Sequence, residues 1–235
     1  MSRTGDALRT LARGVGQVLI TLGLVVLLFV VYELKVTNLY TGQQQSALAD
    51  DIEADWRAGP PDRQGPSVGG TDGYPDIPLG RGFAKIYIPE LGRDYVKVVV
   101  EGVGTANLKK GPGHYPKTAR LGEKGNVVIA GHRTTYGAPF NRVDELEPGD
   151  AIVLETADTW FVYRVRSQEV VPPSRIEVTY PVPHRKGVAP TERLLTLTTC
   201  NPKFSARTRL IVYSVLEKQQ AKSQGRPTAL AEAAT

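Results

Sequence analysis

The hydrophobic residues of this chain follow two patterns: one long apolar run near the N-terminus and a series of short runs after Gly82. The short runs are rich in β-branched and aromatic residues and are bounded by Gly, Pro, Asn or Asp, which is typical of β-strands. About eight strands in roughly 135 residues, without long helices between them, predict an all-β barrel or sandwich with short helical turns. The expected strands are 83–88, 95–100, 126–130, 151–155, 160–165, 170–171, 194–200 and 209–216.

The long apolar run, residues 14–32, carries no formal charge and would span about 28 Å as a helix, close to the bilayer core of about 30 Å. Arg3, Arg9 and Arg13 precede it and acidic residues dominate after it, which places the N-terminus in the cytoplasm. A cleaved signal peptide is the alternative. The run is longer than a usual signal core and no small-residue cleavage site follows it. We therefore predict a single-pass anchor.

Composition divides the chain into five segments. We expect a cytoplasmic tail (1–13), a transmembrane anchor (14–32), a stalk and flexible Gly/Pro-rich linker (33–81), a folded domain (82–217) and a disordered tail (218–235). The formal net charge of +5 is mild and the basic residues are scattered, so the composition gives no support for nucleic-acid binding.

Cys200, the single cysteine, ends the apolar strand 194–200. Outside the cell a lone thiol forms no internal disulfide, so it is either buried and inert or used in chemistry. The next strand begins with Arg209, which places a guanidinium at the mouth of the same hairpin. The thiolate is the reactive form of cysteine, and a positive neighbour favours it. The hairpin is therefore a candidate nucleophilic site.

Three histidines are candidate partners of the thiol. His132 directly follows the buried strand 126–130, and two strand ends at one rim of a barrel bring their side chains together, so it is the preferred candidate. His114 lies in a tight Gly-Pro-Gly loop and His184 in an exposed connection, and both remain alternatives. Arg209 is preferred to Arg207 as an oxyanion donor because it opens a strand and is held by it.

Residues 196–200 (TLTTC), followed by 209–212 (RLIV), resemble the signature of bacterial sortases. Residues 130–140 (AGHRTTYGAPF) resemble the sortase histidine motif, in the form found in class E enzymes of high-GC Gram-positive bacteria, and the loop 111–115 is similar to that class too. The resemblance covers about residues 82–217. It implies a closed eight-stranded sortase β-barrel with short helices and a cysteine transpeptidase without a cofactor.

The resemblance also implies roles for single residues. Cys200 would attack the Thr–Gly carbonyl of a Leu-Ala-X-Thr-Gly or Leu-Pro-X-Thr-Gly sorting signal on a secreted protein. His132 would protonate the departing amine and deprotonate the incoming one, and Arg209 would hold the substrate and the oxyanion. Thr199 is an expected substrate contact. The acyl-thioester would pass to an amino group of a peptidoglycan precursor, so that the enzyme works at the plasma membrane with its catalytic domain outside.

Three other functions compete with this one. A cysteine hydrolase would use the same residues with water as the acceptor. A pilin-polymerising sortase would carry a lid that ends in Asp-Pro-aromatic, whereas this chain has only Asp55-Trp56 before its Gly/Pro-rich stretch. A membrane-tethered β-domain that binds envelope components would keep Cys200 inert and distant from His132. No dense acidic cluster occurs in 82–217, so no metal ion is expected.

Overall fold

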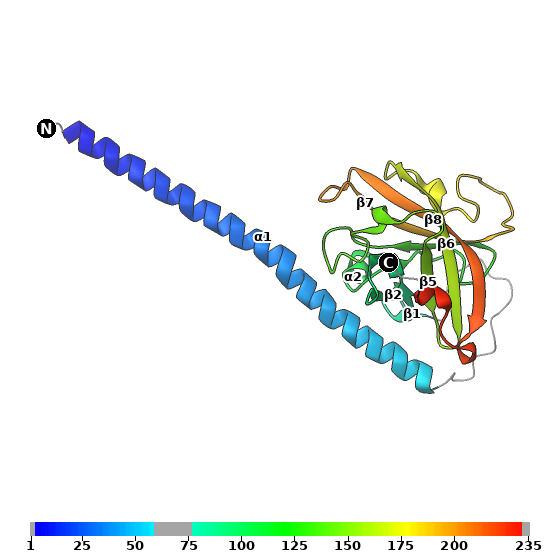
Figure 1. Cartoon of the computed structure of the whole chain (residues 1–235). Coiled ribbons are helices and arrows are strands. Elements are labelled where there is room, and N and C mark those ends of the chain that lie inside the picture. Colours follow the sequence, from blue (N-terminus) through cyan, green and yellow to red (C-terminus); the bar gives the residue numbers. More distant parts are fainter. Residues whose placement is uncertain (1–2, 59–76, 232–235) are drawn as a thin grey trace.

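The computed structural model describes residues 3–58 and 77–231, and only the backbone of residues 3–8 and 33–38. Most of the predicted Gly/Pro-rich linker lies outside the described residues. The chain forms one long helix and a closed β-barrel (Figure 1). The helix is α1 (Arg3–Ala58), and the strands are β1 (Gly82–Tyr87), β2 (Val96–Glu101), β3 (Gly113–His114), β4 (Gly125–Ala130), β5 (Ala151–Glu155), β6 (Thr159–Val171), β7 (Arg193–Asn201) and β8 (Thr208–Ala221). The short helices are α2 (Thr105–Leu108), η1 (Pro89–Leu91), η2 (Val143–Glu145), η3 (Ile176–Thr179), η4 (Lys222–Gln224) and η5 (Thr228–Leu230).

The barrel confirms the predicted all-β class and closed eight-stranded architecture. Its strands follow the order β1-β2-β3-β4-β7-β8-β6-β5 and close on β1. Two pairs are parallel, β2 with β3 and β4 with β7, and the others are antiparallel. The parallel pair β4–β7 matters for function, because the C-terminal ends of two parallel strands lie at the same rim of the barrel.

Alternation along the strands decides which side chains fill the barrel. Leu195 and Leu197 of β7 belong to the main buried core, as do Val127 and Ile129 of β4. Side chains at the intervening positions point to the opposite face of the sheet, because successive residues of a strand alternate. On β7 these positions include Cys200, so the alternation directs its thiol away from the core.

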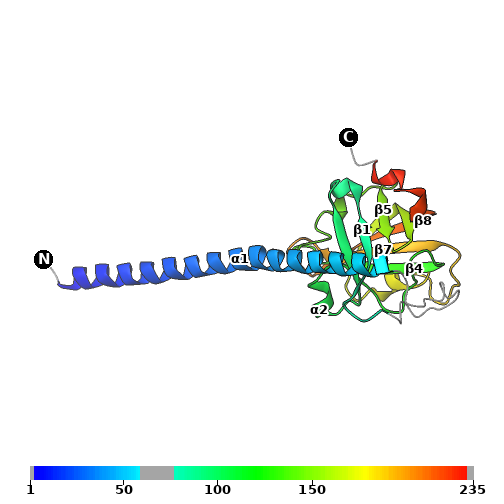
Figure 2. The same cartoon turned by 90° about the horizontal axis from the view of Figure 1, so that it is seen from below.

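The predicted stalk differs from expectation because the second half of α1 packs on the barrel. Leu48 and Ile52 are buried in a small cluster with Val98 and Val100 of β2. Figures 1 and 2 show this half of α1 lying along the barrel while the N-terminal half extends away from it. Within the part of the chain that the structure describes, one segment, Arg9–Tyr32, is long and apolar enough by length and composition to cross a membrane.

The structure also differs from the predicted strands and tail. Strand β6 is continuous for 13 residues, because β8 pairs with it along its whole length, from Val171 opposite Arg209 to Thr159 opposite Ala221. The tail expected to be disordered continues β8 and then forms two 3-10 turns, and Ala229 is buried against the outside of β5 and β6. Polar residues suit this extension because its other face is exposed. The last four residues lie outside the described part.

Candidate active site

Cys200 and Arg209 are cross-strand partners. They lie directly opposite one another in the antiparallel pair β7–β8, near the turn that joins the two strands. Side chains at directly opposite positions project from the same face, with Cβ atoms about 5 Å apart. The Cys200 side chain is half-buried. The hairpin therefore places the predicted thiol and guanidinium side by side on rigid backbone.

His132 reaches the same rim through the parallel pair β4–β7. Ala130 lies opposite Thr198, and the amide of Gly131 donates to the carbonyl of Thr198 at 3.1 Å. Continuing this register by two residues brings His132 level with Cys200. The backbone thus places Cys200, His132 and Arg209 at one rim of the barrel, and their joint catalytic role stays a prediction.

Thr199 ties the two parallel strands together. Its side chain is buried, and its hydroxyl donates to the carbonyl of Gly131 at 2.8 Å, one residue before His132. A Cβ at Gly131 would lie 2.6 Å from the ring of Phe140, so only glycine allows this close approach. The predicted substrate contact at Thr199 stays a prediction, and its hydroxyl has a structural partner at the site.

Arg133 is a site residue that the sequence reasoning missed. Its side chain is only 3% exposed, and Nη1 donates to the carbonyl of Cys200 at 3.4 Å. Nε donates to the carbonyl of Asn141 at 2.8 Å, and Nη2 pairs with Asp144 at 2.9 Å. One buried guanidinium therefore joins the backbone of Cys200 to both ends of the loop that carries His132. In the sequence, the only indication that Arg133 belongs to the site is its position directly after His132.

The imidazole of His132 has a ring nitrogen without a hydrogen-bond partner in the described part of the chain. Nε2 is buried and has no hydrogen-bond partner among the described residues, and the ring centroid lies 5.0 Å from that of Tyr136. Burial lowers the pKa of His132, and the positive charge of Lys109 lowers it further. Lys109 is held over Tyr136, with Nζ 5.2 Å from the ring centroid. Within that part of the chain, the fold therefore leaves this ring nitrogen without the hydrogen-bond partner that a buried polar group normally has.

Arg209 is held by the turn of its own hairpin. Nη1 donates to the carbonyls of Ala206 and Thr208, both at 3.0 Å. Nε and Nη2 carry the other three N–H donors of the guanidinium. A cation fixed in this way beside the thiol is suited to stabilising negative charge on a carbonyl oxygen.

The other two histidines serve different purposes. His114 is fully buried, with Nδ1 2.8 Å from a carboxylate oxygen of Glu101 and Nε2 2.9 Å from the Thr118 hydroxyl. His184 lies 2.7 Å from Glu169 on the outer face of the barrel, and its Nε2 is 3.0 Å from the Tyr213 hydroxyl. Both rings are engaged in contacts of the fold, so the structure favours His132 among the three candidates.

The comparisons with known proteins agree with this geometry. A family model described as a sortase domain matches residues 86–217, more than half of the chain. The chain belongs to the sortase family, whose members are cysteine transpeptidases. It is 38% identical to sortase SrtE1 of Streptomyces coelicolor, over 93% of this chain and 61% of that relative, and 36% identical to SrtE2 of the same organism, over 87% and 81%. Sortase E of Streptomyces avermitilis has a similar structure, with a TM-score of 0.60 at 47% identity, over 65% of this chain and 99% of that one. These relatives place the chain with the class E sortases, and it spans about three fifths of the length of SrtE1.

Proposed function

We propose that this protein is a membrane-anchored transpeptidase that cleaves a sorting signal after threonine and joins the new carboxyl end to an amine. The observation that carries the proposal is the convergence of Cys200, His132 and Arg209 on one rim, through two sets of strand pairing. Class E relatives add the expectation of a Leu-Ala-X-Thr-Gly or Leu-Pro-X-Thr-Gly signal and of a cell-wall acceptor.

The first half-reaction transfers the acyl group to sulfur. The Cys200 thiol passes its proton to neutral His132, and the resulting thiolate attacks the threonine carbonyl carbon to form a C–S bond, while the developing oxyanion accepts hydrogen bonds from Arg209. The C–N bond to glycine then breaks, and protonated His132 gives its proton to the departing amine. The bonding electron pair of the C–N bond stays on the glycine nitrogen, which receives the proton from His132, so charge and protons balance.

The second half-reaction reverses these roles. An amine enters, His132 removes a proton from it, and its nitrogen attacks the thioester carbonyl. The C–S bond breaks and the Cys200 thiolate leaves with the bonding pair. Water in place of the amine would give hydrolysis through the same residues.

Arg133 and Thr199 act as positioning residues in this proposal. Their bonds to the Cys200 and Gly131 carbonyls fix the backbones that carry the nucleophile and the general acid. Effective proton transfer requires this precision, because a misplacement of about 1 Å can cost about a hundredfold in rate.

The test uses the full chain in detergent micelles, since half of α1 packs on the barrel. The protein is incubated with a Leu-Ala-X-Thr-Gly or Leu-Pro-X-Thr-Gly peptide, with and without a glycine-based amine, and the products are read by mass spectrometry beside the Cys200→Ala variant. We expect cleavage after threonine, a new amide to the amine and an acyl adduct on Cys200, all lost in the variant.

Cleavage without transfer would instead establish a hydrolase. Absence of any adduct with either peptide would overturn the proposal in favour of an envelope-binding domain.

A further inference from the structure

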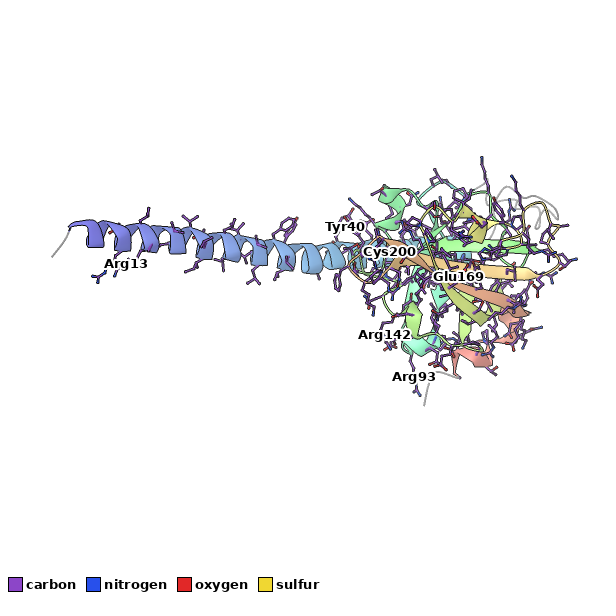
Figure 3. The ribbon with its side chains drawn as sticks, turned by 90° about the horizontal axis from the view of Figure 1, so that it is seen from above. Arg13, Tyr40, Arg93, Arg142, Glu169 and Cys200 are labelled. Atoms are coloured by element: carbon purple, nitrogen blue, oxygen red, sulfur yellow. The ribbon has the colours of Figure 1, made fainter. Side chains whose placement is uncertain are left out.

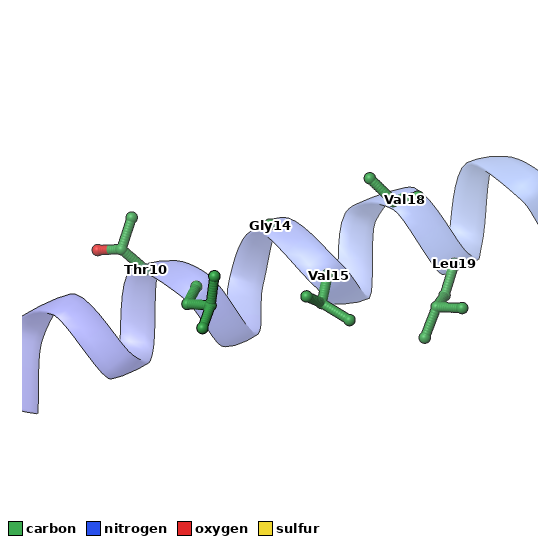
Figure 4. A pocket seen from close by; sticks show the side chains of 6 residues that line it. Thr10, Gly14, Val15, Val18 and Leu19 are labelled. Carbon is green, nitrogen blue, oxygen red and sulfur yellow. The ribbon is translucent and has the colours of Figure 1, made fainter.

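The candidate span and the barrel are joined by one uninterrupted helix. Helix α1 runs from Arg3 to Ala58, and its apolar segment ends at Tyr32. Figure 4 shows Thr10, Gly14, Val15, Val18 and Leu19 along part of this segment, where α1 packs against no other described element. Thr41, where barrel contacts begin, lies nine residues beyond Tyr32, which is about 14 Å along the axis at 1.5 Å per residue.

Side-chain contacts fix the rotation of the barrel about α1. The Gln45 amide binds both backbone groups of Val98, accepting from its N–H at 2.7 Å and donating to its carbonyl at 3.1 Å. It also donates to the carbonyl of Lys110 at 2.7 Å. Asp55 pairs with Arg81 at 2.6 Å, near the other end of the packed half. A helix held at both ends of its contact sets one orientation of the barrel relative to the span.

In this orientation the catalytic rim faces the span. The Thr41 hydroxyl donates to the carbonyl of Lys109 at 3.0 Å, and its methyl group lies against Gly137 of the His132 loop. Figure 3 shows Cys200 on the same side of the barrel as Tyr40, where α1 meets it. The β7–β8 loop projects from this rim toward the N-terminal half of α1 in Figures 1 and 2.

The β7–β8 loop, residues 202–207, has the surface chemistry of a membrane interface. Phe204 is 81% exposed, and Lys203 and Arg207 flank it. Segments that lie in the bilayer interface bury phenylalanine, tryptophan or leucine at the boundary between headgroups and acyl chains, and their basic side chains are attracted to anionic lipids. A water-facing phenylalanine between two cations therefore fits a headgroup layer better than bulk solvent.

We propose that the β7–β8 loop contacts the headgroups of the leaflet from which α1 emerges. Phe204 enters the interface, and Lys203 and Arg207 bind anionic headgroups. The headgroup layer adds about 5–8 Å on each side of the hydrocarbon core, which takes up a large part of the roughly 14 Å of helix between Tyr32 and Thr41. This inference rests on the proposed membrane anchoring by α1. It would hold Cys200 close to the bilayer surface, where a membrane-tethered substrate presents its cleavage site.

The test is lipid quenching of a tryptophan placed in the loop. The full-length Phe204→Trp protein is reconstituted in vesicles of phosphatidylcholine and phosphatidylglycerol brominated near the headgroup, and the wild-type emission of Trp56 and Trp160 is subtracted. We expect the added tryptophan to be quenched at least twofold. The matched control is Val188→Trp. Val188 is 37% exposed and lies before the start of β7, at the end of the strand opposite to the β7–β8 loop. A tryptophan at this position should show no added quenching.

Charge reversal tests the basic residues. In the Phe204→Trp protein, Lys203→Glu with Arg207→Glu should remove most of the added quenching in anionic vesicles. The same reversal at the exposed Arg185 and Lys186 should leave the quenching unchanged.

Vesicle flotation separates the two proposals. A folded chain that floats with vesicles but shows no added quenching at position 204 overturns the loop contact and leaves the anchor intact. A chain that does not float overturns the anchor and the loop contact together. Circular dichroism of each variant checks that it is folded.

Discussion

Two histidines lie close together in this barrel and have opposite environments. His114 is on β3, paired with Ile129 of β4, and His132 follows the end of that same β4. His114 is fully buried, and its ring nitrogens contact Glu101 and Thr118. Nε2 of His132 is also buried but has no partner among the described residues. The fold uses one imidazole as a structural connector and leaves a ring nitrogen of the other without a partner among the described residues.

The difference comes from where each histidine lies on its strand. His114 is within a paired segment that neighbouring elements cover, so its polar atoms must be satisfied internally. His132 lies two residues past the last paired position, Ala130, at the rim where β7 ends with Cys200 and Asn201. Strand ends can present unsatisfied groups to a ligand, and strand interiors cannot do so without a cost in stability.

The largest expected effect separates the two histidines by activity. His132→Gln should lower transpeptidation by about 10²–10⁴-fold, the range contributed by a general acid–base group, with little change in thermal unfolding. His114→Gln should keep most of the activity per folded molecule. Steady-state kinetics on both variants, corrected for folded fraction, measure this. Equal losses of activity in the two variants would contradict the assignment of proton transfer to His132 and of a structural role to His114.

The second effect concerns the buried guanidinium next to His132. Arg133→Lys cannot reproduce three bonds in three directions, so kcat should fall by up to about a hundredfold while KM changes little. Arg142→Lys is the matched control, since Arg142 lies in the same loop and pairs with Glu145 at the surface. A rise in KM alone for Arg133→Lys would assign this residue to substrate binding instead.

The third effect is on stability. His114→Gln removes the ring nitrogen that lies 2.8 Å from the buried Glu101 carboxylate, and should lower the free energy of unfolding by about 1–3 kcal/mol. His184→Gln removes a partly exposed contact with Glu169 and should cost less than about 1 kcal/mol. Chemical denaturation of the full chain in micelles compares the two. A larger loss at His184 would contradict the structural role assigned to His114.

The smallest effect is on protonation. Lys109 lowers the pKa of His132, so Lys109→Gln should raise that pKa toward its ordinary value. Histidine NMR titrations in a Cys200→Ala background measure the shift, with Lys110→Gln as the control. An unchanged pKa in Lys109→Gln would leave burial as the sole cause.

The sign of the related stability effect follows from the same pKa. Because the pKa of His132 is lower in the folded than in the unfolded chain, protonation favours unfolding. The contribution of His132 to the free energy of unfolding is therefore complete above its pKa in the unfolded chain, about 6.5. This contribution is lost as the pH falls below that value. Lys109→Gln should weaken this acid sensitivity.

The sequence alone determined the fold class, most strand positions and the candidate residues Cys200, His132 and Arg209. Local signals suffice there, because strand runs are bounded by Gly and Pro, and a polar residue at the end of an apolar run lies at a barrel rim. Tertiary structure decided which histidine lies at the same rim as Cys200, since this depends on the parallel register of β4 with β7, and long-range pairing leaves no local pattern.

Tertiary structure also decided three features that the sequence reasoning missed. Arg133 became a site residue through contacts with a strand far along the chain, and the second half of α1 joined the barrel through Leu48 and Ile52. The polar tail became ordered because β6 offered it a long edge to pair with. In each case a segment with weak local preference gains its structure from the surface that it meets, which only the assembled barrel provides.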